Sequence, residues 1–256
     1  MTRPGRPKKR LGQHFLKDPN TARIVAGGIT REDVVLEIGA GRGFLTAFLA
    51  ERARLVHAVE LDRDVIPALR EAVRYRENVI VHRADALRMD FSSLRPLPNR
   101  LAANLPYNIA SPLVLRLLEE APFVGWMRFM VQLEVARRMA SRPGSKDYAA
   151  YAVLVQLLGE VRIVHRVPPS VFEPPPRVWS AVVEVRRRER PEDYEVIKEF
   201  VLAVFSSRRK RLVNNLPREV RDRAEAALRE LGRHPDVRAE ELLPGELAAL
   251  HRASSS

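Results

Sequence analysis

The sequence predicts an α/β fold, in which a mostly parallel sheet is followed by a small all-α domain. Short apolar, β-branched runs alternate with amphipathic helical segments along roughly the first two thirds of the 256 residues, and beyond about residue 186 only helical patterns continue. Because parallel strands need crossover helices and are buried on both faces, this alternation indicates helices on both sides of a sheet. We expect one domain over 1–188, with a basic N-terminal arm, and a helical domain over 189–256.

Turn residues and helix caps divide the first domain into its elements. Asp18 is expected as the N-cap of a first helix with Pro19 in its first turn, and Ser111 with Pro112 should open a later one. Two late strands are joined by a proline-rich segment without a helix, so we expect them to be antiparallel and to complete a seven-stranded sheet. The expected strands are 33–38, 54–60, 78–85, 99–105, 127–134, 159–167 and 179–185, and the expected helices of this domain are 17–29, 44–53, 63–75 and 111–120.

The C-terminal region has helical periodicity without strand patterns. Charged residues alternate with apolar stripes at helical spacing over 191–205 and 217–231, and a last short helix is expected over 244–252. These segments are too few to form a second large core, so a small helical domain is predicted.

The charge balance favours a polyanionic partner. Lys and Arg exceed Asp and Glu by 44 − 32 = 12, and the excess is clustered at 3–10, 186–190 and 208–211. An Arg-rich composition from genome bias or a hot habitat would spread more evenly, so nucleic acid is the favoured partner. We expect RNA contacts first from Arg208, Arg209, Lys210 and Arg211, and second from Lys8, Lys9 and Arg10.

Other features of composition limit the chemistry. The chain has no cysteine, which excludes disulfides, thiolate metal sites and cysteine nucleophiles, and we expect no bound metal. No apolar run approaches the ~18 residues of a membrane span, so we expect no membrane partner and a cytoplasmic location.

A glycine-rich turn and two acidic residues predict an adenosine-binding edge. Gly39, Gly41 and Gly43 follow the first strand of the sheet, and Glu60 ends the second strand, where a carboxylate can accept hydrogen bonds from ribose hydroxyls. Asp85 ends the third strand and can accept a hydrogen bond from the adenine amine, although it could instead cap a short helix. Without a P-loop or a glycine pattern for a pyrophosphate, S-adenosylmethionine fits better than ATP or NAD.

The stretch "NLPY" (104–107) follows the fourth strand, at the same edge. The side-chain oxygen of Asn104 and a backbone carbonyl at Pro106 can accept both N–H bonds of an aromatic amine, which frees the nitrogen lone pair for attack. Tyr107 can stack on an extruded base. Alone, this four-residue pattern would be an ordinary turn; beside a nucleotide-binding edge it predicts a methyl-transfer site.

These segments together resemble a known family. "LGQHFLKD", "EIGAGRGFLT", "VELDRD", "NLPYNIASPL" and "VPPSVFEPPPRVWSAVV" resemble the small-subunit rRNA adenine N6,N6-dimethyltransferases of the KsgA or RsmA type, and the resemblance covers nearly the whole chain. It implies a Rossmann-like class I methyltransferase domain that uses S-adenosylmethionine, plus a helical domain that binds RNA. It also implies dimethylation of two adjacent adenines near the 3′ end of 16S rRNA within a pre-30S particle, and we expect a monomer.

The resemblance also assigns residues. Cofactor contacts fall on His14, Leu16, Gly39, Gly41, Glu60, Asp85, Ala86 and Asn104, and contacts with the target base fall on Asn104, Pro106, Tyr107 and Phe172. His14 stands where many relatives have Asn, and Phe172 could instead pack against its neighbouring prolines. Three alternatives remain: an Erm-type enzyme acting on 23S rRNA, a DNA adenine methyltransferase, and an assembly factor that acts mainly by binding.

Overall fold

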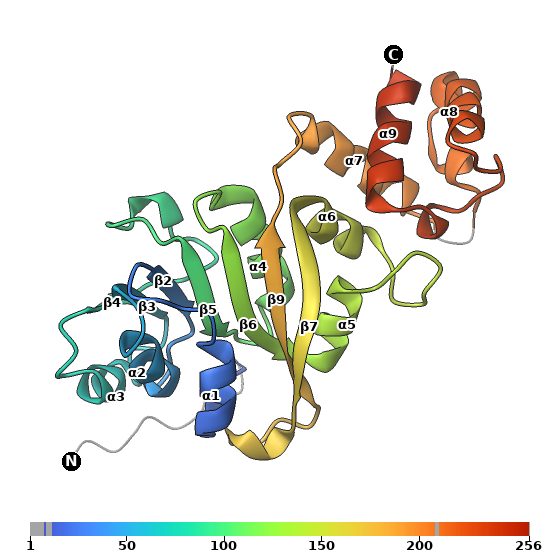
Figure 1. Cartoon of the computed structure of the whole chain (residues 1–256). Helices are drawn as coiled ribbons and strands as arrows, with labels where there is room; N and C mark the ends of the chain where they lie inside the picture. The colour runs from blue at the N-terminus through green and yellow to red at the C-terminus, as the bar shows by residue number, and fades with distance from the viewer. Residues whose placement is uncertain (1–7, 9–11, 208–209, 256) are drawn as a thin grey trace. The chain divides into compact units, whose positions relative to one another are not determined.

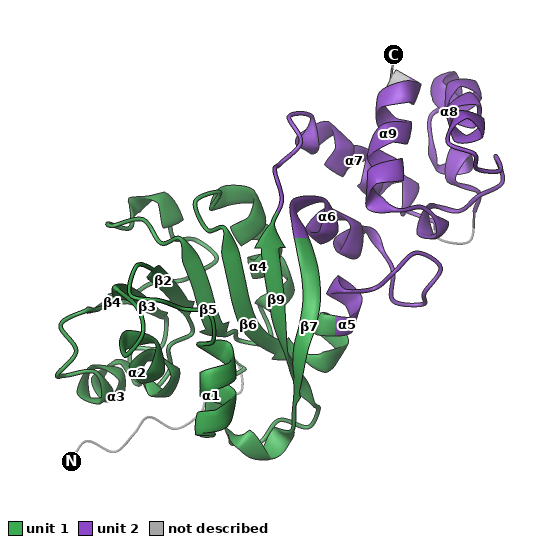
Figure 2. Cartoon of the chain, viewed as in Figure 1, with its two compact units in different colours: residues 1–136, 160–187 green, residues 137–159, 188–256 purple. Residues whose placement is uncertain are grey.

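The computed structural model describes residues 8, 12–207 and 210–255 (Figure 1). It contains two compact units: residues 1–136 with 160–187, and residues 137–159 with 188–256 (Figure 2). The second unit therefore includes a segment from the middle of the chain as well as its C-terminal part. Whether 1–188 and 189–256 are the functional domains stays a prediction.

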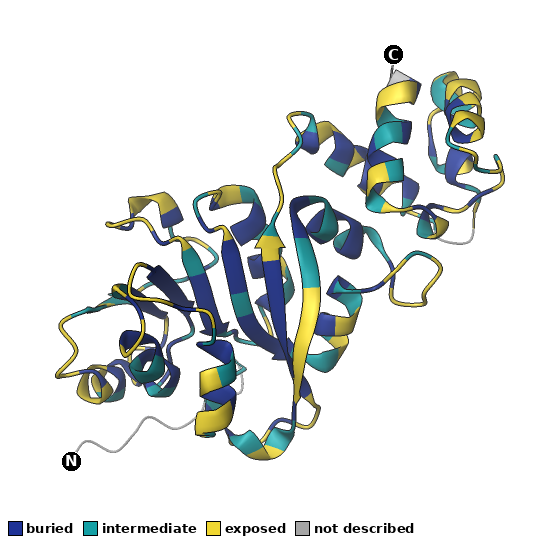
Figure 3. Ribbon diagram, in the orientation of Figure 1, coloured by how far each residue is buried: buried dark blue, intermediate teal, exposed yellow. Residues whose placement is uncertain are grey.

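The first unit is built on a mixed sheet of seven strands in the order β4-β3-β2-β5-β6-β9-β7. The pairs among β2 to β6 are parallel, and β9 is antiparallel to β6, so the predicted sheet with its antiparallel strand is confirmed. Its strands are β2 Val34–Ile38, β3 Leu55–Glu60, β4 Val79–Arg83, β5 Arg100–Asn104, β6 Trp126–Gln132, β7 Gly159–Val167 and β9 Ser180–Arg187. Figure 3 shows buried central strands and an exposed stretch along β7, which lies at the sheet edge.

The helices of this unit start close to the predicted positions, with one correction. In α1, the Asp18 side chain accepts a hydrogen bond from Thr21 N at 2.6 Å, which confirms the predicted N-cap. In α4, by contrast, the N-cap is Ile109, so Ser111 lies inside the first turn rather than capping it, because the turn after "NLPY" already has helical backbone angles. The four predicted helices of this unit are α1 Pro19–Val25, α2 Phe44–Ala50, α3 Ile66–Ala72 and α4 Ala110–Glu120, and a further helix, α5 Leu133–Met139, begins in this unit and ends in the second.

The strand order reverses at one point, and this reversal positions the site. The chain runs outward from β2 through β3 to the edge strand β4, and then returns to place β5 on the other side of β2. Crossover connections are right-handed, so helices after β2 and after β5 cover opposite faces and leave a crevice between the two strands. The glycine turn follows β2 and "NLPY" follows β5, so both segments border this crevice.

An arginine inside the sheet connects three elements of the first unit. Arg128 on β6 lies directly opposite Glu184 on β9, and its Nη2 is 2.5 Å from Glu184 Oε2. Its Nη1 also donates to the carbonyls of Ile24 and Gly27 at the end of α1. Both charged side chains are largely removed from water, so the pair compensates for lost solvation, and the other oxygen of Glu184 also pairs with the more exposed Arg186 at 3.0 Å.

The second unit is helical. It contains α6 Ala150–Leu158, α7 Tyr194–Val204, α8 Arg218–Glu230 and α9 Pro244–Ser255. Tyr148, which is fully buried, donates through its hydroxyl to Leu242 O at 2.9 Å and so connects the segment before α6 to the segment before α9. The bidentate pair of Arg252 with Asp193, at 2.7 and 2.9 Å, joins α9 to the start of α7.

Two helices were not predicted from the sequence. The segment "AYAVLVQLL" forms α6 and continues directly into β7, and α5 follows β6 without a break. Residues of α6 are apolar on nearly all sides, because it is buried in the second unit, so its sequence lacks the periodicity of an amphipathic helix.

Replacing Arg128 should lower stability strongly. In Arg128→Met, Glu184 loses the guanidinium that faces it across the ladder, and we expect the free energy of unfolding to fall by about 3 kcal/mol. Arg162→Met is the matched control, because its pair with Glu160 is exposed and should contribute less than about 1 kcal/mol. Urea denaturation of both variants measures the difference; equal losses would contradict the assigned role of Arg128.

Candidate active site

A cavity of about 580 Å³ lies at the carboxyl ends of β2, β3, β4 and β5. This volume is within the range of sites that enclose nucleotide-sized ligands. All predicted cofactor contacts line it, and so do three of the predicted base contacts: His14, Leu16, Gly39, Gly41, Glu60, Asp85, Ala86, Asn104, Pro106 and Tyr107. The structure thus brings together residues that are up to 93 positions apart in the chain, from 14 to 107.

The glycine turn allows two loops to approach one another closely. Gly39 has φ +75°, and a Cβ there would lie 3.0 Å from Pro106 Cδ; Gly41 has φ +56°, and its Cβ would lie 3.0 Å from the Phe15 ring. Side chains at either position would therefore be strained and would push against a wall of the cavity. The N–H groups of Gly39, Gly41 and Gly43 already donate within the protein, so what the turn offers a ligand is close approach to a backbone without side chains.

Glu60 is held at the end of β3 by backbone donors. Its Oε2 accepts from Gly41 N and its Oε1 from Asp62 N, both at 2.8 Å. Burial raises the pKa of this carboxyl, and the backbone hydrogen bonds partly oppose the increase. Each carboxylate oxygen can accept more than one hydrogen bond, so Glu60 keeps acceptor capacity toward the cavity that could hold ribose hydroxyls.

Asp85 caps a turn and also lines the cavity, as the two alternatives considered from the sequence expected. Its Oδ1 accepts from Leu87 N at 2.9 Å, so it caps the turn after β4, and it also lines the cavity. Ala86 beside it is buried, and its carbonyl accepts from Arg116 at 2.7 Å. The position of this turn is therefore fixed by contacts independent of any ligand.

Asn104 presents an acceptor without a partner. Its Nδ2 donates to the His14 carbonyl at 3.0 Å, and this bond fixes which end of the amide is nitrogen, because a carbonyl can only accept. The opposite atom, Oδ1, is buried and has no hydrogen-bond partner among the described residues. An unsatisfied buried acceptor costs free energy unless a ligand supplies a donor.

Tyr107 is held on two sides. The ring stacks on His14 at 5.4 Å between centroids, and its hydroxyl lies 2.5 Å from Ser180 Oγ at the start of β9. Burial raises the pKa of Tyr107 to about 12, so the phenol keeps its proton at neutral pH and does not serve as a base. Ser180 was not predicted from the sequence; a polar residue directly before the apolar run Ala181–Val183 was the available signal.

Phe172 differs from the other predicted base contacts. It lies in the two-residue strand β8 Phe172–Glu173, which pairs with β1 Phe15–Leu16, and its ring is 1% exposed within the main apolar cluster. It does not line the cavity in the described part of the chain. Phe172 is therefore packed, as the alternative considered from the sequence expected, but within this apolar cluster, which contains none of the neighbouring prolines. A stacking role would require its ring to leave the cluster.

Glu37 also lines the cavity and was not predicted. It is 1% exposed on β2, and its Oε2 has no hydrogen-bond partner within the described chain. Burial raises its pKa to about 8, and the neighbouring Glu60 carboxyl adds to the increase. An acid inside the apolar run "VVLEI" was the signal in the sequence, because charged residues are seldom buried without a partner.

The predicted RNA contacts of the N-terminal arm are described only at Lys8. Its Nζ is 2.6 Å from a carboxylate oxygen of Asp62 and 2.6 Å from one of Asp64, and Asp62 also accepts from Gln13 at 3.0 Å. The charge of Lys8 is therefore compensated within the first unit. Lys9 and Arg10 lie outside the described residues.

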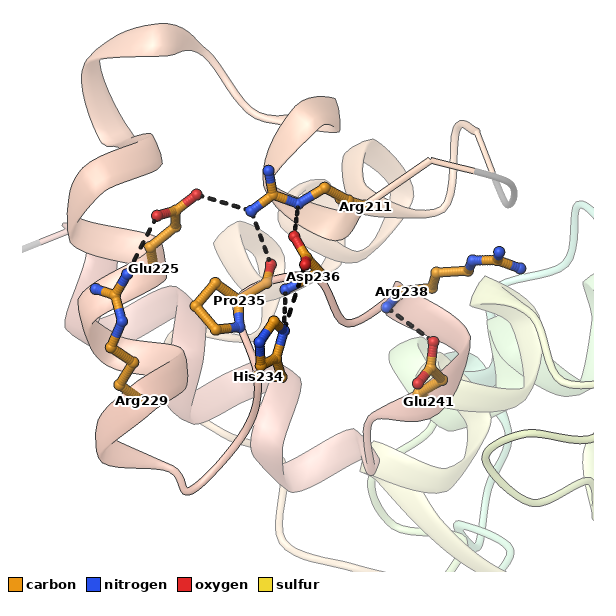
Figure 4. Close-up of polar contacts among 8 residues, drawn as sticks. All are labelled: Arg211, Glu225, Arg229, His234, Pro235, Asp236, Arg238 and Glu241. Atoms are coloured by element: carbon orange, nitrogen blue, oxygen red, sulfur yellow. Dashed lines mark hydrogen bonds and ion pairs between the residues drawn. The ribbon is translucent and has the colours of Figure 1, made fainter.

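The two described side chains of the basic cluster 208–211 differ in their ion pairs and exposure. Arg211 lies within ion-pair distance of Glu225 Oε1 at 3.0 Å and of Asp236 Oδ1 at 2.5 Å, and it also bonds the Pro235 carbonyl (Figure 4). Lys210 is exposed and makes no ion pair with the described residues. Arg208 and Arg209 lie outside the described residues.

The described residues lack two features that are typical of other classes of protein. No helix there is long and apolar enough to cross a membrane. No group of three or more His, Asp or Glu side chains in the described chain is arranged to hold a metal ion.

Comparisons with known proteins agree on one family. A family model described as ribosomal RNA adenine dimethylase matches residues 5–248. The "Ribosomal RNA small subunit methyltransferase A" of Rubrobacter xylanophilus is 70% identical over 98% of this chain and 96% of its own length, and the protein of that name from Alcanivorax borkumensis is 41% identical over 82% and 78%.

Solved structures show the same backbone. A dimethyladenosine transferase from Plasmodium falciparum superimposes with a TM-score of 0.79 at 26% identity, covering 93% of this chain and 96% of that one. The 23S rRNA methyltransferase ErmE superimposes with a TM-score of 0.77 at 29% identity, covering 94% and 100%. Both methyltransferases superimpose over more than nine tenths of this chain, which itself has the predicted seven-stranded mixed sheet, so the predicted fold class is confirmed.

The buried acid Glu37 should make stability depend on pH. In the fold it keeps its proton up to about pH 8, whereas its ordinary pKa is 4.5. The folded state therefore binds more protons than the unfolded chain between these values, and stability falls as pH rises, by up to about 1.4 kcal/mol per pH unit from this group. The raised pKa of Glu60 also makes stability fall as pH rises, so the contribution of Glu37 is measured by comparing the parent with a Glu37 variant.

Glu37→Gln removes this titration while keeping the side chain's size. We expect urea denaturation to show a smaller loss of stability between about pH 5 and about pH 8 in the variant than in the parent. Parallel pH profiles for the two proteins would mean that Glu37 is already ionised in the fold.

Proposed function

The chain belongs to the ribosomal RNA adenine dimethylase family, and from this membership we propose that it dimethylates two adjacent adenines near the 3′ end of 16S rRNA. Members of this family are S-adenosylmethionine-dependent rRNA methyltransferases that modify the adenine N6 amine. We propose a pre-30S particle as the substrate, a cytoplasmic location and a monomeric enzyme. The name of the 70%-identical relative supports the choice of the small subunit.

The unpartnered Oδ1 of Asn104 is the observation that carries the proposal. Nδ2 donates to the His14 carbonyl, so Oδ1 is left as a fixed, unsatisfied acceptor on a residue that lines the cavity. An adenine amine has two N–H donors and would supply the missing partner. When two acceptors together hold both N–H bonds in a tetrahedral arrangement, the nitrogen lone pair is less delocalised into the ring, and the amine becomes a better nucleophile.

The second acceptor is proposed to be the Pro106 carbonyl. It accepts from Ile109 N at 3.2 Å and retains a second lone pair. Tyr107, whose ring is held by His14 and Ser180, would stack on the target base. Together these residues hold the amine in one orientation, which is the main requirement for a displacement reaction.

The cavity fits S-adenosylmethionine by the chemistry of its lining. Glu60 offers acceptors for ribose hydroxyls, Asp85 and Ala86 border the expected adenine position, and a Cβ at Gly39 or Gly41 would narrow the cavity. We propose that His14 and Leu16 complete this set from the N-terminal side. When bound, the cofactor supplies a methyl group already activated as a sulfonium, so no strong general base is needed.

A large-subunit enzyme is the second candidate. ErmE, a 23S rRNA methyltransferase, superimposes nearly as well as the dimethyladenosine transferase, so the backbone does not separate the two substrates. Incubating the protein with a labelled methyl donor and either unmethylated small or large subunits, and mapping the product nucleotides, distinguishes them. Label confined to two adjacent small-subunit adenines is expected; label in 23S rRNA would overturn the substrate assignment.

Removal of the Asn104 amide should stop catalysis without preventing binding. For Asn104→Ala we expect methyl transfer to fall at least about a hundredfold, the usual cost of losing a preorganised polar contact with the reacting group. RNA affinity should stay near that of the parent. Asn20→Ala, an exposed amide on α1, is the control and should methylate normally. Activity close to the parent in Asn104→Ala would overturn the assigned role.

The two described members of the 208–211 cluster should respond differently. Lys210→Gln should weaken binding to the particle and reduce the slope of log affinity against log salt by roughly 0.7–0.9, because one phosphate contact is lost. Arg211→Gln should also lower thermal stability, because Glu225 and Asp236 lose their partner. Arg54→Gln, an exposed residue before β3 at the amino edge of the sheet, is the control for net charge. An unchanged slope in Lys210→Gln would remove Lys210 from the RNA-binding surface.

A further inference from the structure

The loop 174–179 is attached at both ends to residues that hold Tyr107. At its start, the Pro174 carbonyl accepts from His14 Nδ1 at 2.8 Å, and His14 stacks on the Tyr107 ring. At its end, Trp179 is followed by Ser180, whose Oγ contacts the Tyr107 hydroxyl. The loop therefore lies beside the residue proposed to stack on the target base.

The backbone of this loop is well anchored. It contains three consecutive prolines, Pro174 to Pro176, the last of them buried. The Trp179 carbonyl accepts from Leu133 N at 2.9 Å, and Ser180 is in register with Gln132 in the β6–β9 ladder. Proline and these contacts restrict the backbone before any partner binds, so little conformational entropy remains to be lost on binding.

Three successive residues of the loop project into solvent. Trp179 is 50% exposed, Val178 is 46% exposed, and Arg177 is exposed beside them. Trp179 makes no ring or cation contact with the described residues. The other tryptophan, Trp126, is 7% exposed and lies under the guanidinium groups of Arg100 and Arg128. A large aromatic ring left in water beside a substrate site indicates a binding surface.

We propose that Trp179 stacks on an unpaired nucleotide next to the target adenine, with Arg177 facing the RNA backbone. This inference rests on the proposed function. Single-stranded RNA is recognised mainly by aromatic rings that stack on exposed bases and by basic side chains near phosphates, and this loop offers both. Trp179 is then a positioning residue: it fixes the strand so that the neighbouring adenine reaches Asn104 and Tyr107.

Tryptophan fluorescence tests the contact directly. The chain has two tryptophans, so Trp126→Phe leaves Trp179 as the only reporter. Adding a single-stranded RNA with the two adjacent adenines should quench its emission and protect it from acrylamide. Binding of fluorescently labelled RNA without either change would overturn the proposal and would leave Trp179 as a contact for a protein partner. If Trp126→Phe does not fold, acrylamide quenching of the parent protein gives the same answer, because Trp126 is buried.

Kinetics separate positioning from chemistry. Trp179→Ala should raise the KM for RNA roughly tenfold, the size expected from losing one base–aromatic stack, with kcat and the KM for the methyl donor near those of the parent. Trp179→Phe should restore most of the affinity. Tyr75→Ala is the matched control, because Tyr75 is 81% exposed and precedes β4 at the amino edge of the sheet.

The outcomes distinguish the two proposals. If the parent dimethylates small-subunit RNA and Trp179→Ala keeps the parent KM, the inference about Trp179 is wrong and the proposed function stands. If the parent does not methylate small-subunit RNA, the proposed function is wrong, and the quenching experiment alone then decides whether this loop binds RNA.

Discussion

The reversal of strand order between β2 and β5 is the constraint on which the candidate site depends. Because the chain leaves β2 toward one edge of the sheet and returns to place β5 on its other side, the helices that follow these strands diverge. The turns after the two strands then face one another, and a Cβ at Gly39 would lie 3.0 Å from the Pro106 ring. Cofactor residues and base-binding residues therefore share one cavity, and a methyl donor and its acceptor can meet there.

The N-terminal segment completes this crevice from outside the sheet. β1 pairs with β8, and the carbonyl of His14, the residue directly before β1, orients the Asn104 amide. The same histidine contacts Tyr107 through its ring and Pro174 through Nδ1. A substitution in this segment can thus alter the position of a reacting group without touching it. The packing of Phe172 belongs to this arrangement, because its strand is the partner of β1.

Several arginines of this protein bind carbonyls and carboxylates of the protein itself, so their charge is used within the fold. Arg128 binds the end of α1 and Glu184, and Arg187 donates to carbonyls at the end of α4, including Leu118 O at 2.6 Å. Arg211 likewise pairs with acids of its own unit (Figure 4). The net charge of +12 therefore overstates the basic surface available to RNA, and exposed residues such as Lys210 and Arg177 become the better candidates.

The sequence by itself determined the sheet, its antiparallel strand and most elements, because buried parallel strands and capped helices leave local patterns such as "VVLEI" and Asp18-Pro19. It also determined that Gly39, Glu60, Asp85 and Asn104 gather at the carboxyl edge, since each ends or closely follows a strand. It did not reveal α6, because this helix is apolar on nearly all sides and so lacks the alternation of apolar and polar residues that marks an amphipathic helix. Nor did it reveal that Ile109 is the N-cap of α4. Only the tertiary structure decided that Asn104 keeps one free acceptor, that Phe172 is buried and that Trp179 is exposed, because these depend on contacts between residues distant in the chain.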